Sequence, residues 1–164
     1  MDILAHALWT NLLYQPTSGI DRLLPIALGV APDLIPFTPM MIRVAIKRQS
    51  RLWNRVNKDT FETIGRTTPW WVYRLYDLTH SIPVWCVGFV TWWWLAGVVP
   101  WAAFAWLIHI LVDIPTHSRA FFPTPFLWPL CNYNFDGISW GERWFMGVNY
   151  GGCLMAYLYV YFLS

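Results

Sequence analysis

Long apolar stretches without charged residues alternate with two polar stretches along the chain. Residues 3–20, 82–112 and 144–164 contain no Asp, Glu, Lys or Arg, and residues 23–42 contain only Asp33. Such stretches are typical of helices that enter or cross a bilayer, because a soluble helix needs a polar outer face. The pattern therefore predicts an all-α polytopic membrane protein with four to five apolar helices. We expect these helices at residues 3–14, about 23–30, 83–97, 101–114 and 144–163.

Proline and glycine mark the expected ends of several helices. The second apolar helix should end at Pro32, because Pro36 and Pro39 prevent a regular continuation. The sequence GVVP at 97–100 predicts a tight turn, since one helix over 82–114 would be far longer than the roughly 20 residues that span a bilayer. The first helix would rise only about 18 Å. The first two helices are therefore short enough to form a partly inserted hairpin.

Composition and charge support a membrane location. The chain is 57% hydrophobic and 12% charged, whereas soluble domains carry roughly 25% charged residues. Eight of the eleven basic residues lie in the polar loop 38–79, and basic loops tend to stay on the cytoplasmic side. We therefore predict one helical membrane domain, residues 1–164, in the cell inner membrane, with cytoplasmic polar loops at about 38–79 and 118–143. The lipid bilayer is the expected partner, whereas a net charge of +2 and the absence of a nucleic-acid fold signature argue against nucleic-acid binding.

Basic residues recur at helical spacing between Met40 and Lys58, with apolar residues between them. Such a helix could lie on the anionic inner leaflet of the membrane. A solvated loop that follows the positive-inside tendency explains the same charges. The sequence leaves both alternatives open.

The turns between the apolar helices should bring most of the unusual polar residues to one membrane face. His6 stands near the start of the first helix, and the chain then turns once to reach Asp33. The polar loop stays on that side and ends with Asp77 and His80. The next two helices return the chain to the stretch HILVDIPTH, residues 109–117, which contains the other two histidines. All four histidines should therefore lie near one another.

The stretch HILVDIPTH contains the strongest candidate ligands of a metal ion. His109 and Asp113 are four residues apart, so they share one face of a helix, and Pro115 can turn His117 back towards them. Imidazole nitrogen and carboxylate oxygen suit zinc and other divalent metals. A histidine hydrogen-bonded to its own aspartate is the structural alternative, although ionisable residues inside a membrane are costly and usually functional. We expect donor atoms of His80, His109 and Asp113 within about 5 Å of a common point.

The other candidate residues have weaker local patterns. In the sequence DLTHS, His80 is a candidate ligand, and Asp77 could be a ligand, a base or a partner that orients an imidazole. Either hydroxyl residue of DLTHS could instead cap the next helix. Asp33 lies between two prolines in APDLIP and could be a ligand or a solvated turn residue. His6 is a candidate only through its expected position beside the others.

At these positions the chain resembles the YdjM-like family, which is described as LexA-regulated, inner-membrane, metal-dependent hydrolases. The family pattern has an early histidine, a Pro-Asp pair, a Thr-His-Ser motif, a His-x3-Asp-x2-Thr motif and a downstream Trp-Pro pair. The matching positions are His6, Pro32–Asp33, Thr79–His80–Ser81, His109–Asp113–Thr116 and Trp128–Pro129. The resemblance covers roughly residues 1–140. Its specificity lies in the order and spacing of these short motifs.

Two departures from the family pattern bear on the number of metal ions. Many members have a second acid two residues after the Pro-Asp pair, where this chain has Ile35. Many also have a histidine five residues before that of Thr-His-Ser, where this chain has Leu75. These losses weaken the case for a multi-metal centre. Asp77 and His117 could compensate for them.

The resemblance and the candidate ligands together predict a site for a divalent metal ion near the cytoplasmic face. Zinc is the expected metal, and manganese or iron is left open. The expected ligands are His80, His109 and Asp113, completed or supported by Asp33, His6 and His117.

The expected function is that of a membrane-bound, metal-dependent hydrolase. The metal would lower the pKa of bound water towards neutrality, and Asp77 or Asp33 would accept its proton. A phosphoester or acyl bond of a lipid-like or amphiphilic substrate is the expected target, because the site would open at the depth of the lipid headgroups. The alternative is a non-catalytic metal-binding membrane protein, such as a transport component or an assembly factor.

Overall fold

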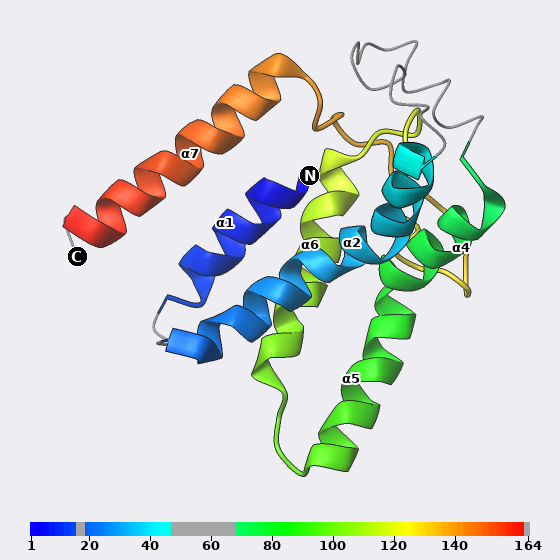
Figure 1. Ribbon diagram of the computed structural model, residues 1–164, viewed down its shortest axis with the longest axis horizontal. Helices are drawn as coiled ribbons and strands as arrows, with labels where there is room; N and C mark the ends of the chain where they lie inside the picture. The colour runs from blue at the N-terminus through cyan, green and yellow to red at the C-terminus, as the bar shows by residue number, and fades with distance from the viewer. Residues whose placement is uncertain (16–18, 47–67, 163–164) are drawn as a thin grey trace.

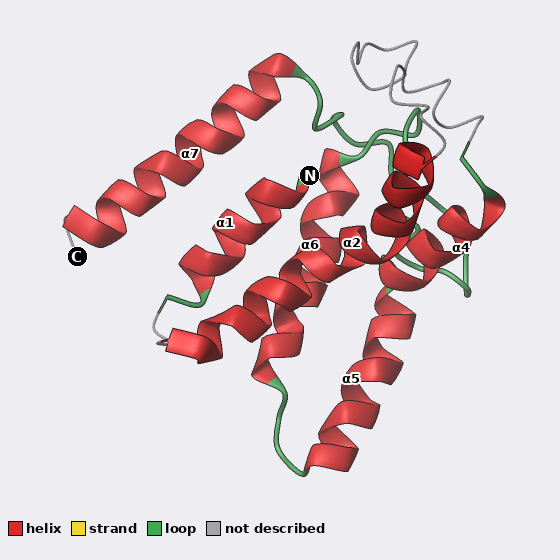
Figure 2. Cartoon of the chain, in the orientation of Figure 1, coloured by secondary structure: helices red, strands yellow, loops and turns green. Residues whose placement is uncertain are grey.

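The computed structural model describes residues 1–15, 19–46 and 68–162, and every regular element in these ranges is a helix (Figure 2). The all-α prediction is therefore confirmed for the described part of the chain. Four of the expected apolar helices coincide closely with observed ones, and the second is much longer than expected. The helices are α1 (Ile3–Leu13), η1 (Gly19–Arg22), α2 (Leu23–Ile46), α4 (Trp70–Thr79), α5 (Ile82–Ala96), η3 (Trp101–Ala103), α6 (Phe104–Thr116) and α7 (Arg143–Phe162), where η1 and η3 are short 3-10 helices.

Local sequence explains where α1 and α5 begin and where α5 ends. The Asp2 carboxylate accepts a hydrogen bond from the backbone N–H of Ala5 at 3.0 Å. The Ser81 hydroxyl caps α5 in the same way, because it accepts from the N–H of Val84 at 3.1 Å. Gly97 ends α5 with a φ of 69°, a left-handed conformation that glycine adopts at little steric cost. The expected turn after α5 and the alternative of a helix cap in DLTHS are therefore both observed.

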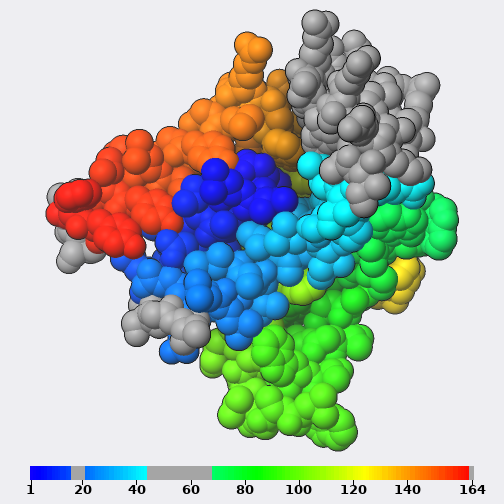
Figure 3. All heavy atoms as spheres, viewed as in Figure 1, coloured from blue at the N-terminus to red at the C-terminus, as the bar shows by residue number. Residues whose placement is uncertain are grey.

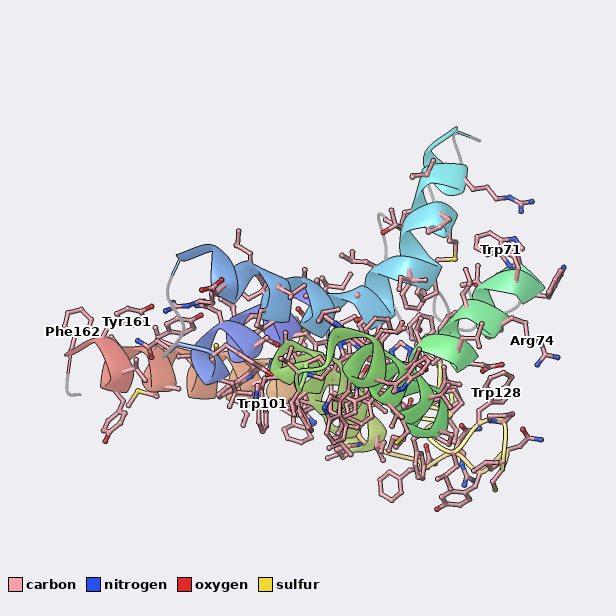
Figure 4. The ribbon with its side chains drawn as sticks, turned by 90° about the horizontal axis from the view of Figure 1, so that it is seen from below. Trp71, Arg74, Trp101, Trp128, Tyr161 and Phe162 are labelled. Carbon is pink, nitrogen blue, oxygen red and sulfur yellow. The ribbon has the colours of Figure 1, made fainter. Side chains whose placement is uncertain are left out.

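The largest difference from the sequence prediction is α2, which continues through Pro32, Pro36 and Pro39. Prolines bend a helix because they lack an N–H and crowd the preceding turn, and Figure 4 shows a bend between the two halves of α2. Pro36 cannot donate to the carbonyl of Pro32, which accepts a hydrogen bond from the Thr79 hydroxyl at 2.9 Å instead. Pro32 and Pro36 are also fully buried. Tertiary contacts thus hold this helix together, and the prediction that it ends at Pro32 is wrong.

α2 is the central helix of the fold and packs against α1, α4 and α6 (Figure 1). Its approach to α1 is close at Gly29, where an added Cβ would lie 2.5 Å from the Oγ1 atom of Thr10. α5 and α6 run antiparallel to one another (Figure 1). α7 lies beside α1, and Trp9 Nε1 on α1 donates to Asn149 Oδ1 on α7 at 2.9 Å. In the space-filling view, α1 fills the space between α7 and α2 (Figure 3).

The segment 118–142 contains no helix and connects α6 to α7 along the chain. It also makes hydrogen bonds with the end of α6 and with the start of α5. Its Gly137 N–H donates to the carbonyl of His117 at 2.9 Å. The contact is so close that a Cβ on Gly137 would lie 2.3 Å from the carbonyl oxygen of Pro115. At the start of α5, the Ser81 hydroxyl donates to the carbonyl of Trp128. The segment therefore fixes the end of α6, which carries candidate ligands, and the start of α5, which directly follows one.

Among the described residues, one helix, Leu23–Arg43, is long and apolar enough to cross a membrane. The core helix of a soluble protein can meet the same criteria. The apolar helices Ile3–Leu13, Ile82–Ala96 and Trp101–Thr116 are shorter. The expectation of a polytopic chain with four to five membrane helices therefore stays a prediction.

The two polar loops of the sequence analysis differ in structure. Residues 118–142 are irregular, as expected. The loop 38–79 is helical at both ends, because α2 reaches Ile46 and α4 begins at Trp70. The basic helix expected between Met40 and Lys58 is described only as far as Ile46, and the rest of it lies outside the described residues.

Candidate metal centre

Four buried side chains converge where α2, α4 and α6 meet. Asp33 comes from α2, His80 directly follows α4, and His109 and Asp113 lie one turn apart on α6. One donor atom of each residue lies within 4.8 Å of the donor atoms of the other three, and the four residues are 0–4% exposed. The distances agree with the expectation for His80, His109 and Asp113, and they add Asp33 to the same group. These four residues could therefore hold a metal ion.

The separations between the donor atoms fit a single small cation. Nε2 of His109 lies 3.2 Å from Nε2 of His80 and 3.1 Å from Oδ2 of Asp113. Oδ1 of Asp33 lies 3.5 Å from Nε2 of His80 and 3.8 Å from Nε2 of His109. Two ligands about 2.0 Å from a zinc ion in tetrahedral geometry would be about 3.3 Å apart. The side chains thus stand close to the positions that such an ion requires.

Backbone carbonyls fix the orientation of both imidazoles in this group. Nδ1 of His109 lies 2.7 Å from the carbonyl oxygen of Gly29, and Nδ1 of His80 lies 3.2 Å from that of Tyr76. A carbonyl only accepts hydrogen bonds, so in the neutral rings Nδ1 carries the proton and Nε2 keeps its lone pair. The two lone pairs then face each other, which is unfavourable unless a metal ion or a proton lies between them. Orientation of this kind is the usual arrangement at histidine-metal sites.

Asp113 is the carboxylate around which the cluster is built. Its Oδ2 atom is buried and has no hydrogen-bond partner within the described residues, and a buried charged oxygen without a partner is costly. A bound cation would relieve this cost, so the donor set fits a metal. Without metal, a proton on His80 lowers part of the cost of burying the charged oxygen. Burial lowers the pKa of His80, but the nearby carboxylates of Asp113 and Asp33 outweigh burial and raise it above its usual value.

The two remaining histidines also contact Asp113. His6 on α1 has its Nε2 atom 3.0 Å from Oδ1 of Asp113, and its ring stacks on that of His109 with centroids 3.6 Å apart. His117 follows α6, with Nε2 3.6 Å from Oδ2 of Asp113 and Nδ1 2.8 Å from the Phe122 carbonyl, to which it donates. Burial is the main reason that the pKa of His117 falls to about 4, so its ring is neutral. All four histidines of the chain thus surround one carboxylate.

Asp77 lies outside this cluster. It is part of α4, and its Oδ2 atom lies 3.8 Å from Nη1 of Arg74, whose side chain is exposed. Figure 4 shows Arg74 at the outer side of α4, directed away from the helix bundle. Burial raises the pKa of the Asp77 carboxyl above its usual value, and Arg74 opposes part of that effect. The role of Asp77 as a base stays a prediction.

Sequence reasoning missed Tyr76, which is buried beside the cluster. Its ring stacks on His80 with centroids 3.8 Å apart, and its hydroxyl donates to the Phe122 carbonyl at 2.9 Å and lies 3.3 Å from Nδ1 of His117. Burial raises the pKa of Tyr76 well above its usual value, so the hydroxyl remains protonated. The sequence did contain one signal for Tyr76. It stands four residues before His80, a spacing that places the two residues on the same face of a helix.

No family model, curated protein or solved structure matches the chain. The resemblance to the YdjM-like family therefore rests on the short motifs quoted above and stays a hypothesis. The described structure defines an all-helical protein with a buried cluster of two histidines and two aspartates that could hold a metal ion. The geometry of this cluster is therefore the main guide to function.

Proposed function

We propose that this chain is a membrane-bound, metal-dependent hydrolase that acts on a phosphoester or acyl bond of a lipid-like substrate. The observation that carries the proposal is the convergence of two imidazole nitrogens and two carboxylate oxygens at separations that suit one divalent cation. When bound, such a cation supplies activation of water and polarisation of a carbonyl or phosphoryl oxygen. Zinc is the first candidate because it favours mixed nitrogen and oxygen ligands, and manganese and iron are further candidates.

Asp33 is the favoured acceptor of the proton that water must lose. Its side chain is 6% exposed, whereas those of His80 and Asp113 are fully buried. Water approaching the cluster would therefore meet the Asp33 carboxylate first. A carboxylate has two oxygens, so one can face the cation while the other accepts a proton. Asp77, ion-paired with Arg74, is the second candidate for this role.

An apolar cavity beside the metal centre supports a lipid-like substrate. The cavity has a volume of about 250 Å³ and lies among α2, α4, α5 and α6. Leu78 in its wall is two residues before His80, and the indole N–H of Trp106, also in the wall, donates to the Thr79 carbonyl at 2.7 Å. Such walls favour a hydrocarbon group over a polar one. The lining residues are Leu28, Leu78, Val84, Trp85, Gly88, Phe89, Trp92, Ala103 and Trp106.

Apolar side chains on the outer surface support a membrane location. On α5, Val87, Trp94 and Leu95 are 69–79% exposed, and the C-terminal helix α7 exposes further aromatic residues, including Tyr161 and Phe162, which stand at its end in Figure 4. Soluble monomers rarely expose large contiguous apolar patches. The basic residues of the loop 38–79 favour the cytoplasmic side for that loop. Because His80 directly follows the loop, the metal centre would lie near the cytoplasmic face of the inner membrane.

A non-catalytic metal-binding membrane protein, such as a transport component or an assembly factor, is the second candidate. The observation that favours it is the near-complete burial of all four donor residues. Structural metal sites are closed, whereas catalytic sites keep one position open for water or substrate. The two candidates therefore differ in whether the metal-loaded protein turns over a substrate.

The test combines metal analysis with hydrolysis assays on protein purified in detergent without a chelator. The substrates are p-nitrophenyl acyl esters and phosphodiesters with hydrocarbon tails of increasing length, each assayed with zinc, manganese and iron(II). We expect metal-dependent hydrolysis that is lost in His109→Ala and retained in Cys86→Ser, a matched change at an exposed position on α5. Protein that binds metal stoichiometrically but hydrolyses none of these substrates would exclude the hydrolase and favour the second candidate.

A further inference from the structure

We propose that Asp113 bridges two divalent cations, and that its Oδ1 atom forms a second cation subsite together with His6 and His117. The proposal rests on the metal centre of the proposed hydrolase, because Asp113 would belong to both subsites. The first subsite is the group of four donors described above. The second subsite lies between α1 and the end of α6.

The two oxygens of Asp113 face different groups of donors. Oδ2 faces Nε2 of His80 at 3.5 Å and Nε2 of His109 at 3.1 Å. Oδ1 contacts Nε2 of His6 at 3.0 Å and the nitrogen of Met1. Nε2 of His117 lies 3.6 Å from Oδ2 and 3.0 Å from the Met1 nitrogen, so His117 stands between the two groups. A carboxylate placed in this way can share its two oxygens between two cations, which in two-metal sites lie about 3.5–4 Å apart. Asp113 is therefore placed as a bridge, with nitrogen donors on both sides.

The stacked rings of His6 and His109 indicate how far apart two cations would be. The ring centroids are 3.6 Å apart and the planes differ by 19°. Each ring directs its Nε2 atom to a different oxygen of Asp113, at 3.0 Å for His6 and 3.1 Å for His109. Two cations bound by nearly parallel rings would be separated by about the spacing of the rings, which lies within the range of about 3.5–4 Å for two-metal sites.

The Met1 nitrogen occupies the place that the second cation would take, so the cation would have to displace it. This nitrogen contacts Oδ1 of Asp113 and lies 3.0 Å from Nε2 of His117 and 3.2 Å from Oγ1 of Thr116. Because Nδ1 of His117 donates to the Phe122 carbonyl, the lone pair on Nε2 faces this position. An anionic oxygen, a hydroxyl and an imidazole lone pair are also donors that suit a divalent cation. His117 would therefore be the third donor of the second subsite.

The second subsite uses neither of the two positions at which many members of the resembled family have a further acid or histidine. Those positions hold Ile35 and Leu75, whereas His6 and His117 come from α1 and from the residue after α6. Two cations would also narrow the choice of substrate. Two-metal sites stabilise both the attacking and the leaving oxygen of an in-line displacement, so the pair of subsites favours a phosphoester over an acyl bond.

Metal content per chain, with Mn²⁺ as the probe, tests the second subsite. Protein in detergent is stripped with a chelator, loaded with Mn²⁺, freed of excess metal and analysed. We expect about two ions per chain in the wild type and about one in His6→Gln and in His117→Gln. Tyr150→Phe is the matched control, because it removes a hydrogen bond from α7 to Asp2 at the start of α1 without removing a donor. This control should keep both ions.

Electron paramagnetic resonance shows whether the two ions share a bridge. Two Mn²⁺ ions joined by one carboxylate couple magnetically, so the wild-type spectrum should differ from the single-ion spectrum of His6→Gln. Two uncoupled ions, or one ion whose binding is unchanged in His6→Gln, would overturn the second subsite and leave the first intact. If His6→Gln does not fold, as judged by circular dichroism, the metal content of His117→Gln and the resonance spectrum of the wild type test the second subsite instead.

The outcomes also separate this inference from the proposed function. Binding of no ion at all would overturn the second subsite together with the metal centre of the hydrolase. Two coupled ions without hydrolysis of any substrate would support the second subsite and exclude the hydrolase.

Discussion

Nδ1 of His109 on α6 donates a hydrogen bond to the carbonyl of Gly29 on α2 at 2.7 Å. This bond joins the helix that carries Asp113 to the helix that carries Asp33. A carbonyl in this position fixes the ring of a metal-binding histidine and raises the basicity of its other nitrogen. The geometry of the centre therefore depends on the register between α2 and α6.

Gly29→Ala should weaken both the fold and the metal centre. The added Cβ would lie 2.5 Å from Oγ1 and 3.2 Å from Cβ of Thr10, so α1 and α2 would have to separate. Overpacking of this kind costs about 1–3 kcal/mol of stability, and displacement of the carbonyl from His109 should lower metal affinity about 10–100-fold. Thermal unfolding in detergent and competition with a chromophoric chelator measure the two effects. The double variant with Thr10→Ala should recover part of the stability, and a double variant that recovers none would contradict the steric explanation.

Asp113→Asn should lose metal while the protein still folds, because asparagine keeps the size of the side chain and removes its charge. Asp77→Asn is the matched control, since Asp77 lies outside the cluster beside Arg74. Metal per chain, measured after purification without a chelator, should fall sharply in the first variant and stay unchanged in the second. If Asp113 only orients His109, the affinity should fall about 10–100-fold and binding should persist at high metal concentration. Wild-type protein that takes up no divalent metal on titration would exclude the centre.

Acid should release the metal, because a proton and a metal ion compete for Nε2 of His80. In the metal-free protein, burial lowers the pKa of His80, but Asp113 and Asp33 outweigh burial and raise it. A raised pKa keeps the ring protonated up to a higher pH, so competition should already be present above about pH 6.5. The apparent affinity should then fall by up to about tenfold per pH unit of acidification while one proton is displaced. Isothermal titration calorimetry at several pH values between about 8 and 5 measures this slope, and an affinity that does not change over this range would argue against His80 as a ligand.

The loop 38–79 should lie in the cytoplasm, because it holds eight of the eleven basic residues. Reporter fusions inserted at Asn57 and placed after Ser164 should report opposite sides of the membrane. A reporter at Asn57 that is active only outside the cytoplasm would reverse the proposed orientation. If both reporters lie on the same side, the number of membrane crossings between them must differ from the proposed one.

The hydrophobic pattern sufficed to predict most of the helices and the grouping of the histidines. α5 and α7 follow from charge-free stretches, and the turn at Gly97 follows from a residue that adopts positive φ easily. The spacing of His109 and Asp113 on one helix face was also visible in the sequence, because a helical period depends only on local geometry. The helices, the turn and this spacing are set by neighbours along the chain, whereas the grouping of the histidines was inferred from the expected turns between apolar helices.

The features that could not be predicted depend on contacts between distant residues. Rules for proline describe an isolated helix, so they placed an end at Pro32 and could not include the Thr79 hydroxyl, which donates to its carbonyl. Tyr76 belongs to no sequence motif. Its hydroxyl contacts His117 and Phe122, which lie far along the chain, so the sequence around Tyr76 does not indicate its position beside the cluster. The sequence also could not show that Asp77 lies outside the cluster, because a side chain just before the end of a helix can face either the cluster or the outer surface.

The prolines of α2 also determine the order in which the protein can assemble. An internal proline costs about 3 kcal/mol in an isolated helix, and α2 contains three of them. We therefore expect the second half of α2 to become helical only after its neighbours have docked and covered Pro32 and Pro36. Asp33 lies between these two prolines, so it reaches the other donors late in folding. A partly folded chain would then hold a cation only weakly, and the complete binding site would itself be a sign that folding has finished.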